Sequence, residues 1–459
     1  MNELSGCLSE AEIELAKHCM AFALDNGAEK VRITLTRSLL NLVGVLNGEV
    51  DKVSHALDRS LQLNLFAEGR FGTFSSNRMD KEEMEEFILE AIATVRMLEA
   101  DRFRDLPSPE RVAKDASSGL ELDLYDTEYK SLDSEMRREM ALGSMSWPKK
   151  DELEVKLGVK AKGIKLVSEE GEYSDSVFDS ITIDSNGLFA RHTETSFEIG
   201  YEVTVEDSKG NLYSSYWWDA APKLMDLKLM DCSETAVKRA AEQIGPKGIK
   251  SGKYTIVVDT ECASKLLTPV LNALGGFSLQ QKNSFLEGSL GKKVFPECLS
   301  IWDKPRSKGE TGSRLFDSEG VATKEIPIIE KGVVKQYFLN TYIAAKMGMK
   351  PTIEDVSRVE VKPVAGCRTL NDVLEKAGDC IYVTGFNGGN SNSATGNFSY
   401  GIEGFLVKDG KLVYPVKEAL MTGNFVSLWN GLTAAASDAR PCMSKLIPTL
   451  AFSNVDISA

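Results

Sequence analysis

Histidine is scarce in this chain of 459 residues, and its scarcity limits the chemistry that the chain can perform. Only three histidines occur, at His18, His55 and His192, and no two of them are spaced as zinc ligands on one helix are. An H-E-x-x-H helix needs two imidazoles one turn apart, so it cannot occur after His192. We interpret all three histidines as structural or surface residues. The sequence predicts no catalytic residue, metal ligand or cofactor-binding residue in this chain.

The thiols and carboxylates of the sequence provide few candidates for a nucleophile or a metal ligand. Cys262 and Cys298 have no histidine near them in the sequence that could stabilise a thiolate, so we interpret both as buried thiols. Asp317 and Glu319, in Phe-Asp-Ser-Glu-Gly, could ligate a metal, but two carboxylates alone hold Mg²⁺ or Ca²⁺ only weakly. No G-x-S-x-G elbow, Walker loop or Rossmann fingerprint is present. These residues favour a binding surface over a catalytic centre.

The segment 385–404 is the candidate for such a surface, because it is rich in Gly, Asn, Ser and Thr. It lies between two apolar runs, Ile381–Val383 and Phe405–Val407, that we expect to be strands. A loop of this composition tolerates left-handed φ and exposes backbone N–H and C=O groups. It could offer them to an extended peptide, as in β-augmentation. The alternative is a plain connecting loop. The side chains that we predict to line a peptide groove are Asn387, Asn390, Thr395, Asn397 and Ser399.

Charge and composition exclude several classes of function. The chain has 54 Lys and Arg against 68 Asp and Glu, for a net charge of −14, whereas nucleic-acid binders need a basic surface. No run of about 18 uncharged apolar residues suggests a membrane span. The N-terminus lacks the basic and apolar regions of a secretory signal. The eight cysteines never form a C-x-x-C pair, which is typical of reduced thiols, so we expect a cytoplasmic protein.

The elements that must position these residues begin with an N-terminal α+β region. Ser9 and Glu12 form a capping-box pattern for a helix that ends at Gly27, and Asp80 is placed to cap a second helix. Between the helices, the apolar runs predict strands with a hairpin turn at Asn47-Gly48. The predicted strands are Val31–Leu35, Leu39–Leu46 and Leu61–Phe66.

Farther along the chain, apolar residues recur at every second position. This alternation of apolar and polar residues at 153–159, Ile181–Ile183 and 197–205 predicts an antiparallel sheet with one face exposed to solvent, with Trp217 and Trp218 at its edge. We expect helices opening at Ser233 and at Thr260, with a strand at Tyr254–Val258 between them. The remaining predicted helices are Thr341–Met347 and Leu370–Ala377. An Asp409-Gly410 turn is predicted to join the last two strands. The remaining predicted strands are Phe316–Val321, Ile326–Ile329, Val333–Phe338, Ile381–Thr384, Phe405–Val407 and Leu412–Tyr414.

Taken together, these elements predict the α+β class. We expect three domains: an N-terminal α+β domain over 1–105, a middle and mainly antiparallel β domain over 106–228, and a β-rich C-terminal domain over 229–459.

An ordered set of short motifs resembles the TldD/PmbA family over nearly the whole chain. The motifs are Asn47-Gly-Glu-Val50, Gly69-Arg-Phe-Gly72, Phe316-Asp-Ser-Glu-Gly-Val321, Gly332-Val-Val-Lys335, Thr395-Gly-Asn-Phe-Ser399, Gly404-Phe-Leu-Val407 and Pro415-Val416. TldD-type chains of that family carry an H-E-x-x-x-H zinc motif on the helix after a Gly-Lys-Tyr-type strand, and PmbA (TldE)-type chains do not. The corresponding stretch here, 269–276, contains no metal ligand. The chain therefore resembles the PmbA/TldE type.

This resemblance implies a function. A PmbA/TldE-type chain is expected to pair with a TldD-like subunit, which holds the zinc, in a cytoplasmic metalloprotease that acts on unfolded or extended peptides. The family's label as a modulator of DNA gyrase gains no support from the acidic composition. The sequence departs from the family at Asn397, where an acidic residue is common.

Two alternatives stay open. One is a stand-alone peptidase or hydrolase with a non-standard site around Asp317 and Glu319. The other is a homodimeric binding or scaffold protein without a link to proteolysis.

Overall fold

The structure is a computed structural model that describes residues 4–145, 163–228 and 231–459. The chain forms two compact units, each assembled from several stretches of sequence. Unit 1 comprises Met1–Lys238, Arg306–Thr323 and Asn340–Ile353, and unit 2 comprises Arg239–Pro305, Lys324–Leu339 and Glu354–Ala459. The alternation expected at 153–159 lies outside the described residues.

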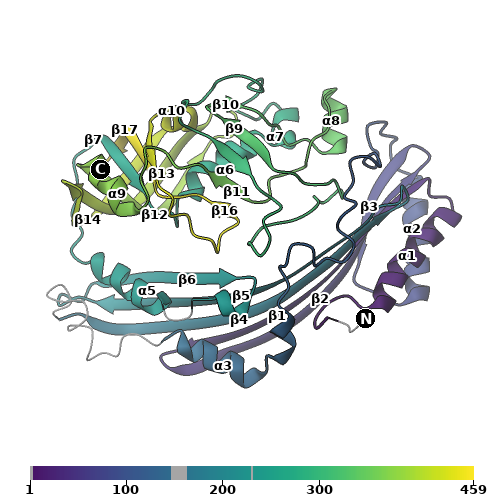
Figure 1. The fold of residues 1–459 in the computed structure, drawn as a ribbon, viewed down its shortest axis with the longest axis horizontal. Coiled ribbons are helices and arrows are strands. Elements are labelled where there is room, and N and C mark those ends of the chain that lie inside the picture. The colour runs from purple at the N-terminus through teal and green to yellow at the C-terminus, as the bar shows by residue number, and fades with distance from the viewer. Residues whose placement is uncertain (1–3, 146–162, 229–230) are drawn as a thin grey trace. The chain divides into compact units, whose positions relative to one another are not determined.

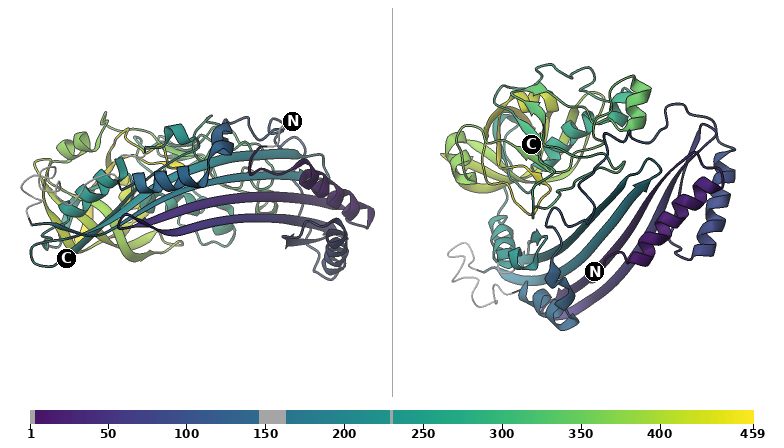
Figure 2. Two further views of the ribbon diagram at one scale, coloured as in Figure 1. Left: turned by 90° about the horizontal axis from the view of Figure 1, so that it is seen from below. Right: turned by 45° about the vertical axis from the view of Figure 1, so that its right-hand side comes forward.

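Unit 1 is built on one six-stranded antiparallel sheet with the order β3-β2-β1-β4-β5-β6, which we call the open sheet (Figure 1). Four of its strands are long, so the sheet extends well beyond the helices that cover it (Figure 2). The strands are β1 (Lys30–Leu46), β2 (Glu49–Ala67), β3 (Arg70–Ser76), β4 (Lys165–Asp184), β5 (Phe189–Glu206) and β6 (Leu212–Ala221).

Two helices, α1 (Glu10–Asp25) and α2 (Lys81–Val95), cover one end of the open sheet. The hydroxyl of Ser9 accepts the backbone N–H of Glu12, and the Glu12 carboxylate accepts that of Ser9, so the predicted capping box is confirmed. Asp80 caps α2, also as predicted. The apolar faces of both helices pack on β1 and β2 around a buried cluster that includes Ile13, Ala16, Ile33, Leu63, Ile88 and Val95.

The other end of the sheet carries buried charge. The 3-10 helix η1 (Thr127–Ser131) and helix α3 (Ser134–Gly143) lie there, with α3 against β1 and β4. Asp175 is only 1% exposed, and its carboxylate accepts hydrogen bonds from Arg137 (Nε–Oδ2 2.6 Å), Tyr129 (2.8 Å) and Asn41 (2.8 Å). A buried carboxylate is tolerated only with such partners, so this cluster fixes α3 and η1 on the strands.

In unit 1, the predicted turn at Asn47-Gly48 is confirmed by φ values of 49° and 90°, and Trp217 and Trp218 lie on the edge strand β6. The two strands predicted at Val31–Leu35 and Leu39–Leu46 are in fact one. Polar residues 36–38 continue the ladder against 58–60 of β2 without interruption, because hydrogen bonding between backbones does not depend on side-chain polarity.

The α+β class is confirmed, with an N-terminal α+β part, an antiparallel sheet and a β-rich C-terminal part. The division into domains at 105/106 and 228/229 stays a prediction. Unit 1 also contains η4 (Leu224–Asp226) and α8 (Thr341–Met347), and α5 (Asp231–Glu242) has residues in both units.

Unit 2 contains a second six-stranded sheet, with the order β14-β13-β12-β7-β17-β15. Because β14 also pairs with β17, five of these strands close into a ring, and we call this the closed sheet. The predicted Asp409-Gly410 turn joins β13 to β14 with φ values of 48° and 74°. The strands are β7 (Gly252–Val258), β12 (Cys380–Ser391), β13 (Asn397–Lys408), β14 (Lys411–Asn424), β15 (Leu432–Ala435) and β17 (Leu450–Ser458).

A smaller sheet and four helices complete unit 2. The small sheet has the order β10-β9-β8-β11-β16. Its strands are β8 (Ile301–Asp303), β9 (Ile326–Glu330), β10 (Val333–Val334), β11 (Val359–Val361) and β16 (Lys445–Leu446), and the helices are α6 (Ser264–Ala273), α7 (Gly276–Gln280), α9 (Leu370–Ala377) and α10 (Phe425–Asn430).

Four further local predictions are wrong. Cys298 is exposed, although the sequence predicts a buried thiol. Thr260 does not cap α6; instead the Asp259 carboxylate accepts the N–H of Glu261 (2.9 Å) and closes the turn before the helix. The run at Phe316–Val321 is a turn with isolated bridges, and the run at Val333–Phe338 yields only the two residues of β10. No helix in the described part of the chain is long and apolar enough to cross a membrane.

Candidate functional site

The Gly- and Asn-rich segment 385–404 is a β-hairpin, and not the loop that its composition predicts. Strands β12 and β13 run through it and leave only 392–396 as the turn. Its glycines allow close approach of the two backbones. A Cβ on Gly404 would lie 2.0 Å from the carbonyl oxygen of Tyr382, and one on Gly401 would lie 2.3 Å from that of Asn387. Glycine is therefore needed here for space between strands.

The five predicted groove residues all lie on this hairpin, and all are exposed. Several of them hold the hairpin itself: Asn387 donates to the Glu403 carboxylate (2.9 Å), and Asn397 accepts from the side chain of Asn424 (2.9 Å). The hydroxyl of Thr395 accepts the N–H of Asn397 (3.3 Å), and Asn390 pairs with Ser399 across the ladder. Their role in binding a peptide stays a prediction.

The opposite face of the hairpin is aromatic. Side chains alternate along a strand, so Phe398 and Tyr400 point away from exposed Asn397 and Ser399. Tyr400 stacks against Phe398 (centroids 5.3 Å apart) and meets the edge of Phe386 (5.6 Å). The three rings therefore form a connected aromatic cluster, in which Phe398 and Tyr400 are buried.

A cavity of about 430 Å³ lies between the aromatic face and helix α6. The ammonium group of Lys265 lies 5.0 Å from the ring centroid of Tyr400, which places one positive charge beside the cavity. The lining residues are Cys262, Ser264, Lys265, Thr268, Pro269, Phe386, Ser391 and Tyr400. Composition did not reveal this cavity, although the alternation of aromatic residues at 398 and 400 within a polar segment was a visible signal.

Beneath the cavity, Asp259 organises a buried polar cluster. Its carboxylate accepts the hydroxyl of Tyr382 and lies 3.5 Å from the Arg239 guanidinium. Burial and the charge of Asp259 raise the pKa of the Tyr382 hydroxyl and of the Cys262 thiol above their ordinary values. Cys262 therefore remains a thiol at neutral pH, where it is a poor nucleophile. The cluster supports the wall of the cavity and does not activate a nucleophile.

The donor set around this cavity does not fit zinc. Helix α6 reads SKLLTPVLNA and supplies no imidazole, carboxylate or thiolate. Among the described residues, no group of three or more His, Cys, Asp or Glu side chains is arranged to hold a metal ion. A catalytic zinc needs three protein ligands of these types.

The carboxylates considered for a metal are engaged in structure. Asp317 accepts the N–H groups of Glu319 and Val321 (both 2.9 Å), and Glu319 accepts the N–H and hydroxyl of Thr341 (both 2.8 Å). They close a turn and fix the start of α8 at these positions. This geometry does not favour a hydrolytic site.

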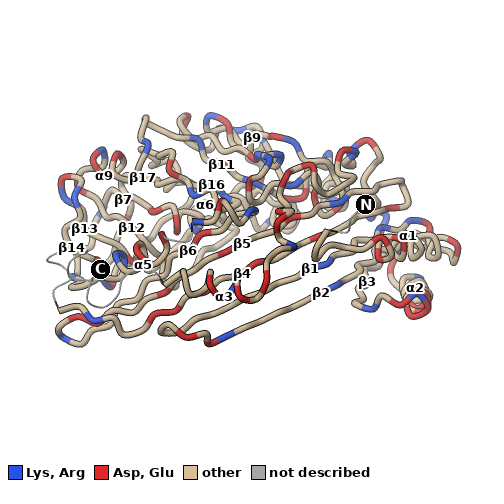
Figure 3. Tube along the Cα trace, turned by 60° about the horizontal axis from the view of Figure 1, so that its bottom comes forward, with Lys and Arg blue, Asp and Glu red and all other residues tan. Residues whose placement is uncertain are grey.

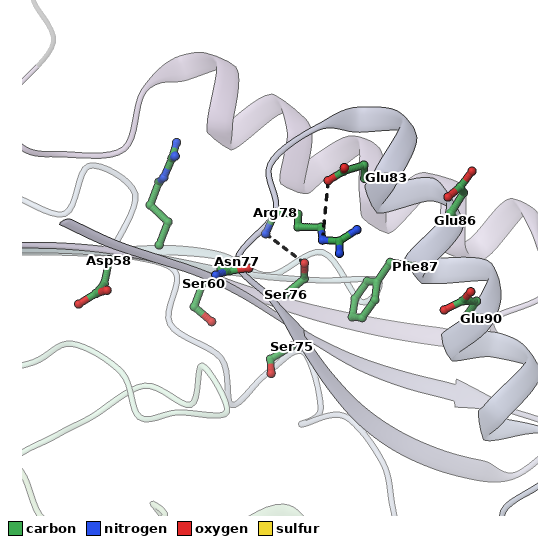
Figure 4. Close-up of a pocket in the computed structure, with 11 residues that line it drawn as sticks. Asp58, Ser60, Ser75, Ser76, Asn77, Arg78, Glu83, Glu86, Phe87 and Glu90 are labelled. Carbon is green, nitrogen blue, oxygen red and sulfur yellow. Dashed lines mark hydrogen bonds and ion pairs between the residues drawn. The ribbon is translucent and has the colours of Figure 1, made fainter.

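A second hollow, of about 730 Å³, lies in unit 1 between α2, the middle of β2 and the end of β3. Figure 4 shows the Arg78 side chain beside Glu83, with Glu86 and Glu90 farther along α2 and Asp58 on the strand. Side chains of both charges line it, so it selects no single class of ligand.

Comparison with known proteins gives one consistent result. Three domains of one family match: PmbA/TldA metallopeptidase domain 1 over residues 32–95, the central domain over 125–244 and the C-terminal domain over 251–459. The metalloprotease PmbA of Escherichia coli O157:H7 is 24% identical over 451 residues, which are 96% of each chain. A PmbA homologue of Haemophilus influenzae is 24% identical and covers 95% of this chain and 94% of its own.

Solved structures agree. A protein of Bacteroides thetaiotaomicron, described as a candidate modulator of DNA gyrase, is 36% identical, with a TM-score of 0.91 over 98% of this chain and 99% of its own. TldE of Thermococcus kodakarensis has a TM-score of 0.81 over 97% and 100% at 19% identity, which shows a shared fold.

Proposed function

The chain belongs to the PmbA/TldD metallopeptidase family, and from this premise we propose that it is a PmbA/TldE-type subunit without a metal centre of its own. In this proposal it forms part of the substrate chamber of a metalloprotease, and a TldD-like partner holds the zinc. The substrate is an unfolded or extended peptide, and the complex works in the cytoplasm, where the thiols of all eight cysteines stay reduced.

The observation that carries the proposal is the composition of α6. This helix follows strand β7 and lines the cavity at the centre of the candidate site, yet it offers only Ser, Thr, Lys, Asn, Pro and aliphatic side chains. A site with this shape and without metal ligands is suited to binding a substrate whose hydrolysis takes place elsewhere.

Strand β12 supplies a place for an extended peptide. It pairs with β7 only at Ile381–Val383, and no described strand pairs with it on that side over the following residues, 384–391. Backbone groups on an unpaired strand edge bind an extended chain by β-augmentation. Phe386 and Tyr400 beside the cavity would then contact alternate side chains of the peptide.

The test is to co-express this chain with a TldD-like chain from the same genome. We expect a stable complex that cleaves an unfolded peptide, with zinc in proportion to the partner, and no cleavage by this chain alone. If this chain purified by itself contains stoichiometric zinc and hydrolyses the peptide, the proposal is wrong.

A pair of variants on α6 tests the role of the cavity. Thr268→Arg places a long side chain in the cavity, and we expect it to reduce cleavage by the complex about tenfold or more through the loss of peptide contacts. Asn272→Arg is the matched control, since Asn272 is exposed on the same helix and does not line the cavity. Equal activity of the two variants would contradict this use of the cavity.

A further inference from the structure

The outer edge of β2 in the open sheet is unpaired over much of its length. Strand β3 pairs with β2 only from Leu61 to Ala67, whereas β1 pairs with the other side of β2 from Glu49 to Phe66, with one bulge at Asp51. No described strand pairs with the outer edge between Glu49 and Ser60. Half of the N–H and C=O groups of these residues point to that edge, which makes it a template for another strand.

This edge carries charged residues and a bulge at Asp51, which are usual for an unpaired strand, but it also exposes apolar side chains, which are not. Proteins normally protect such an edge with charge or proline and avoid apolar residues there. Here Val53 is 73% exposed and Leu57 is 45% exposed, and Lys52 and Asp58 flank them. Figure 3 shows β2 at the margin of the sheet, with both blue and red segments along it. The edge therefore combines an apolar centre with opposite charges at its two ends.

We propose that this edge binds the same edge of a second copy of the chain, as two antiparallel β2 strands related by a two-fold axis at His55. In this register, Lys52 of one copy lies opposite Asp58 of the other, and Val53 lies opposite Leu57. Ser54 lies opposite Ala56. Each pair occurs twice, and the two open sheets join into one.

The order of charges selects this register. Directly opposite residues in an antiparallel ladder lie on the same face, so a two-fold pairing can shift only in steps of two residues. One such step sets Lys52 opposite Ala56, and the step in the other direction sets it opposite Ser60. Both shifts also separate Val53 from Leu57. Opposite charges and paired apolar side chains directly across strands each favour the ladder, so the register at His55 is the best of the three.

The register depends on the central seven residues. The next pair outward, Asp51 with Arg59, is of opposite charge, but a bulge displaces Asp51 from the ladder with β1 and Arg59 already pairs with Glu12. Lys52 and Asp58 make no ion pair with other described side chains, so both are available to a second copy. Beyond Ser60, strand β3 occupies the edge and limits the length of the pairing.

A charge exchange tests the proposal without changing the fold. Lys52→Asp places a new carboxylate opposite that of Asp58 in two places, and Asp58→Lys sets two lysines opposite each other. We expect the wild-type full-length chain to be a dimer in analytical ultracentrifugation, and each single variant to dissociate about tenfold more readily. The double variant Lys52→Asp/Asp58→Lys restores both pairs, and we expect it to recover the wild-type dissociation constant.

A cross-link tests the register. His55→Cys brings two thiols directly opposite each other across the axis, so mild oxidation should give a covalent dimer. Ser54→Cys is the matched control, because in this register Ser54 faces Ala56 and the two new thiols lie about two residues apart along the strands. A monomeric wild-type chain, a double variant no better than the single variants, or equal cross-linking at both positions would overturn the proposal.

These outcomes are separate from those of the proposed function. Self-association is measured without a TldD-like chain and without peptide, so loss of cleavage leaves the result unaffected. If a TldD-like chain binds with the same sensitivity to the two charge variants while the chain alone remains monomeric, the edge serves a different partner and the pairing of two copies is wrong.

Discussion

The two six-stranded sheets of this chain differ in how the backbone groups at their edges are paired. The closed sheet of unit 2 joins β14 to β17 at Leu420–Thr422 and so forms a ring, in which β12 is unpaired by any described strand on one side only at 384–391. The open sheet of unit 1 is longer, and it leaves one side of β2 unpaired by any described strand from Glu49 to Ser60. Closure removes most of the free edge within a sheet, whereas an open sheet keeps an edge with which another strand can pair. In our proposals, the cavity of unit 2 binds the peptide and the open edge of unit 1 binds a second copy.

The largest effect should come from the buried charges that hold the open sheet. Arg191 donates to Asp179 (Nη2–Oδ2 2.6 Å), which is fully buried and also accepts from Thr193 and from the N–H of Leu8. Arg191→Met leaves that carboxylate without its charge partner, and we expect a loss of about 3–5 kcal/mol in the free energy of unfolding by urea denaturation.

The control for this prediction is an exposed ion pair in the same unit. Arg138→Ala removes the pair with Glu135 on the surface of α3, and we expect a change below about 0.5 kcal/mol. Similar losses for both variants would show that buried charge has no special part in the open sheet.

Glycine should be far less replaceable in the closed sheet than in the open one. In Gly404→Ala the new Cβ meets the backbone of Tyr382 at 2.0 Å, so the strands must separate, and we expect a loss of about 2–3 kcal/mol. In Gly44→Ala on β1 the nearest atom is the Cβ of Lys52 at 3.4 Å, and we expect a loss of less than about 0.5 kcal/mol. Thermal unfolding of the two variants measures the difference, and equal losses would contradict the close strand approach in the hairpin.

The buried cluster beneath the cavity should contribute less than the ion pairs of unit 1. Tyr382→Phe removes one of the hydrogen bonds that Asp259 accepts but keeps the ring, and the N–H of Glu261 still donates to the carboxylate. We expect a loss of about 1–2 kcal/mol in urea denaturation. No measurable loss would mean that Asp259 does not depend on the hydroxyl.

The smallest effect should be the response of α1 to acid. Partial burial favours the neutral form of Glu12, but hydrogen bonds from Ser9 and the charge of Arg37 outweigh it and lower the pKa of Glu12 below its ordinary value of 4.5. A carboxylate with a lowered pKa stabilises the folded state above the ordinary pKa, and this contribution is lost as the pH falls below it. Glu12→Gln should therefore flatten the dependence of the unfolding free energy on pH below about 4.5. An unchanged slope would contradict the assignment.

The sequence predicted local elements well where the signal lay within a few residues. The capping box at Ser9, the cap at Asp80 and the turns at Asn47-Gly48 and Asp409-Gly410 all depend on neighbouring residues, and all are confirmed. A helix start or a tight turn has only a few acceptable residue types, so composition is informative there.

The hairpin and its cavity could not be predicted from neighbouring residues in the sequence. Glycines at 401 and 404 suggested freedom of φ, but their requirement is space against residues 387 and 382, which are distant in the sequence. The cavity likewise depends on α6 meeting the aromatic face of β12 and β13, more than a hundred residues later in the sequence. Such contacts depend on tertiary packing, and no local pattern encodes them. The role of the five predicted groove residues is still a prediction for the same reason.

The charges on β2 are self-complementary about His55, and this limits the number of copies that can join through this edge. When two copies meet across one axis, each uses the same residues that it offers, so neither keeps a free binding surface of that kind. The bulge at Asp51 and the cover of β3 beyond Ser60 leave no room on this edge for a further strand. Growth through β2 would therefore stop at a pair and could not continue into a fibre.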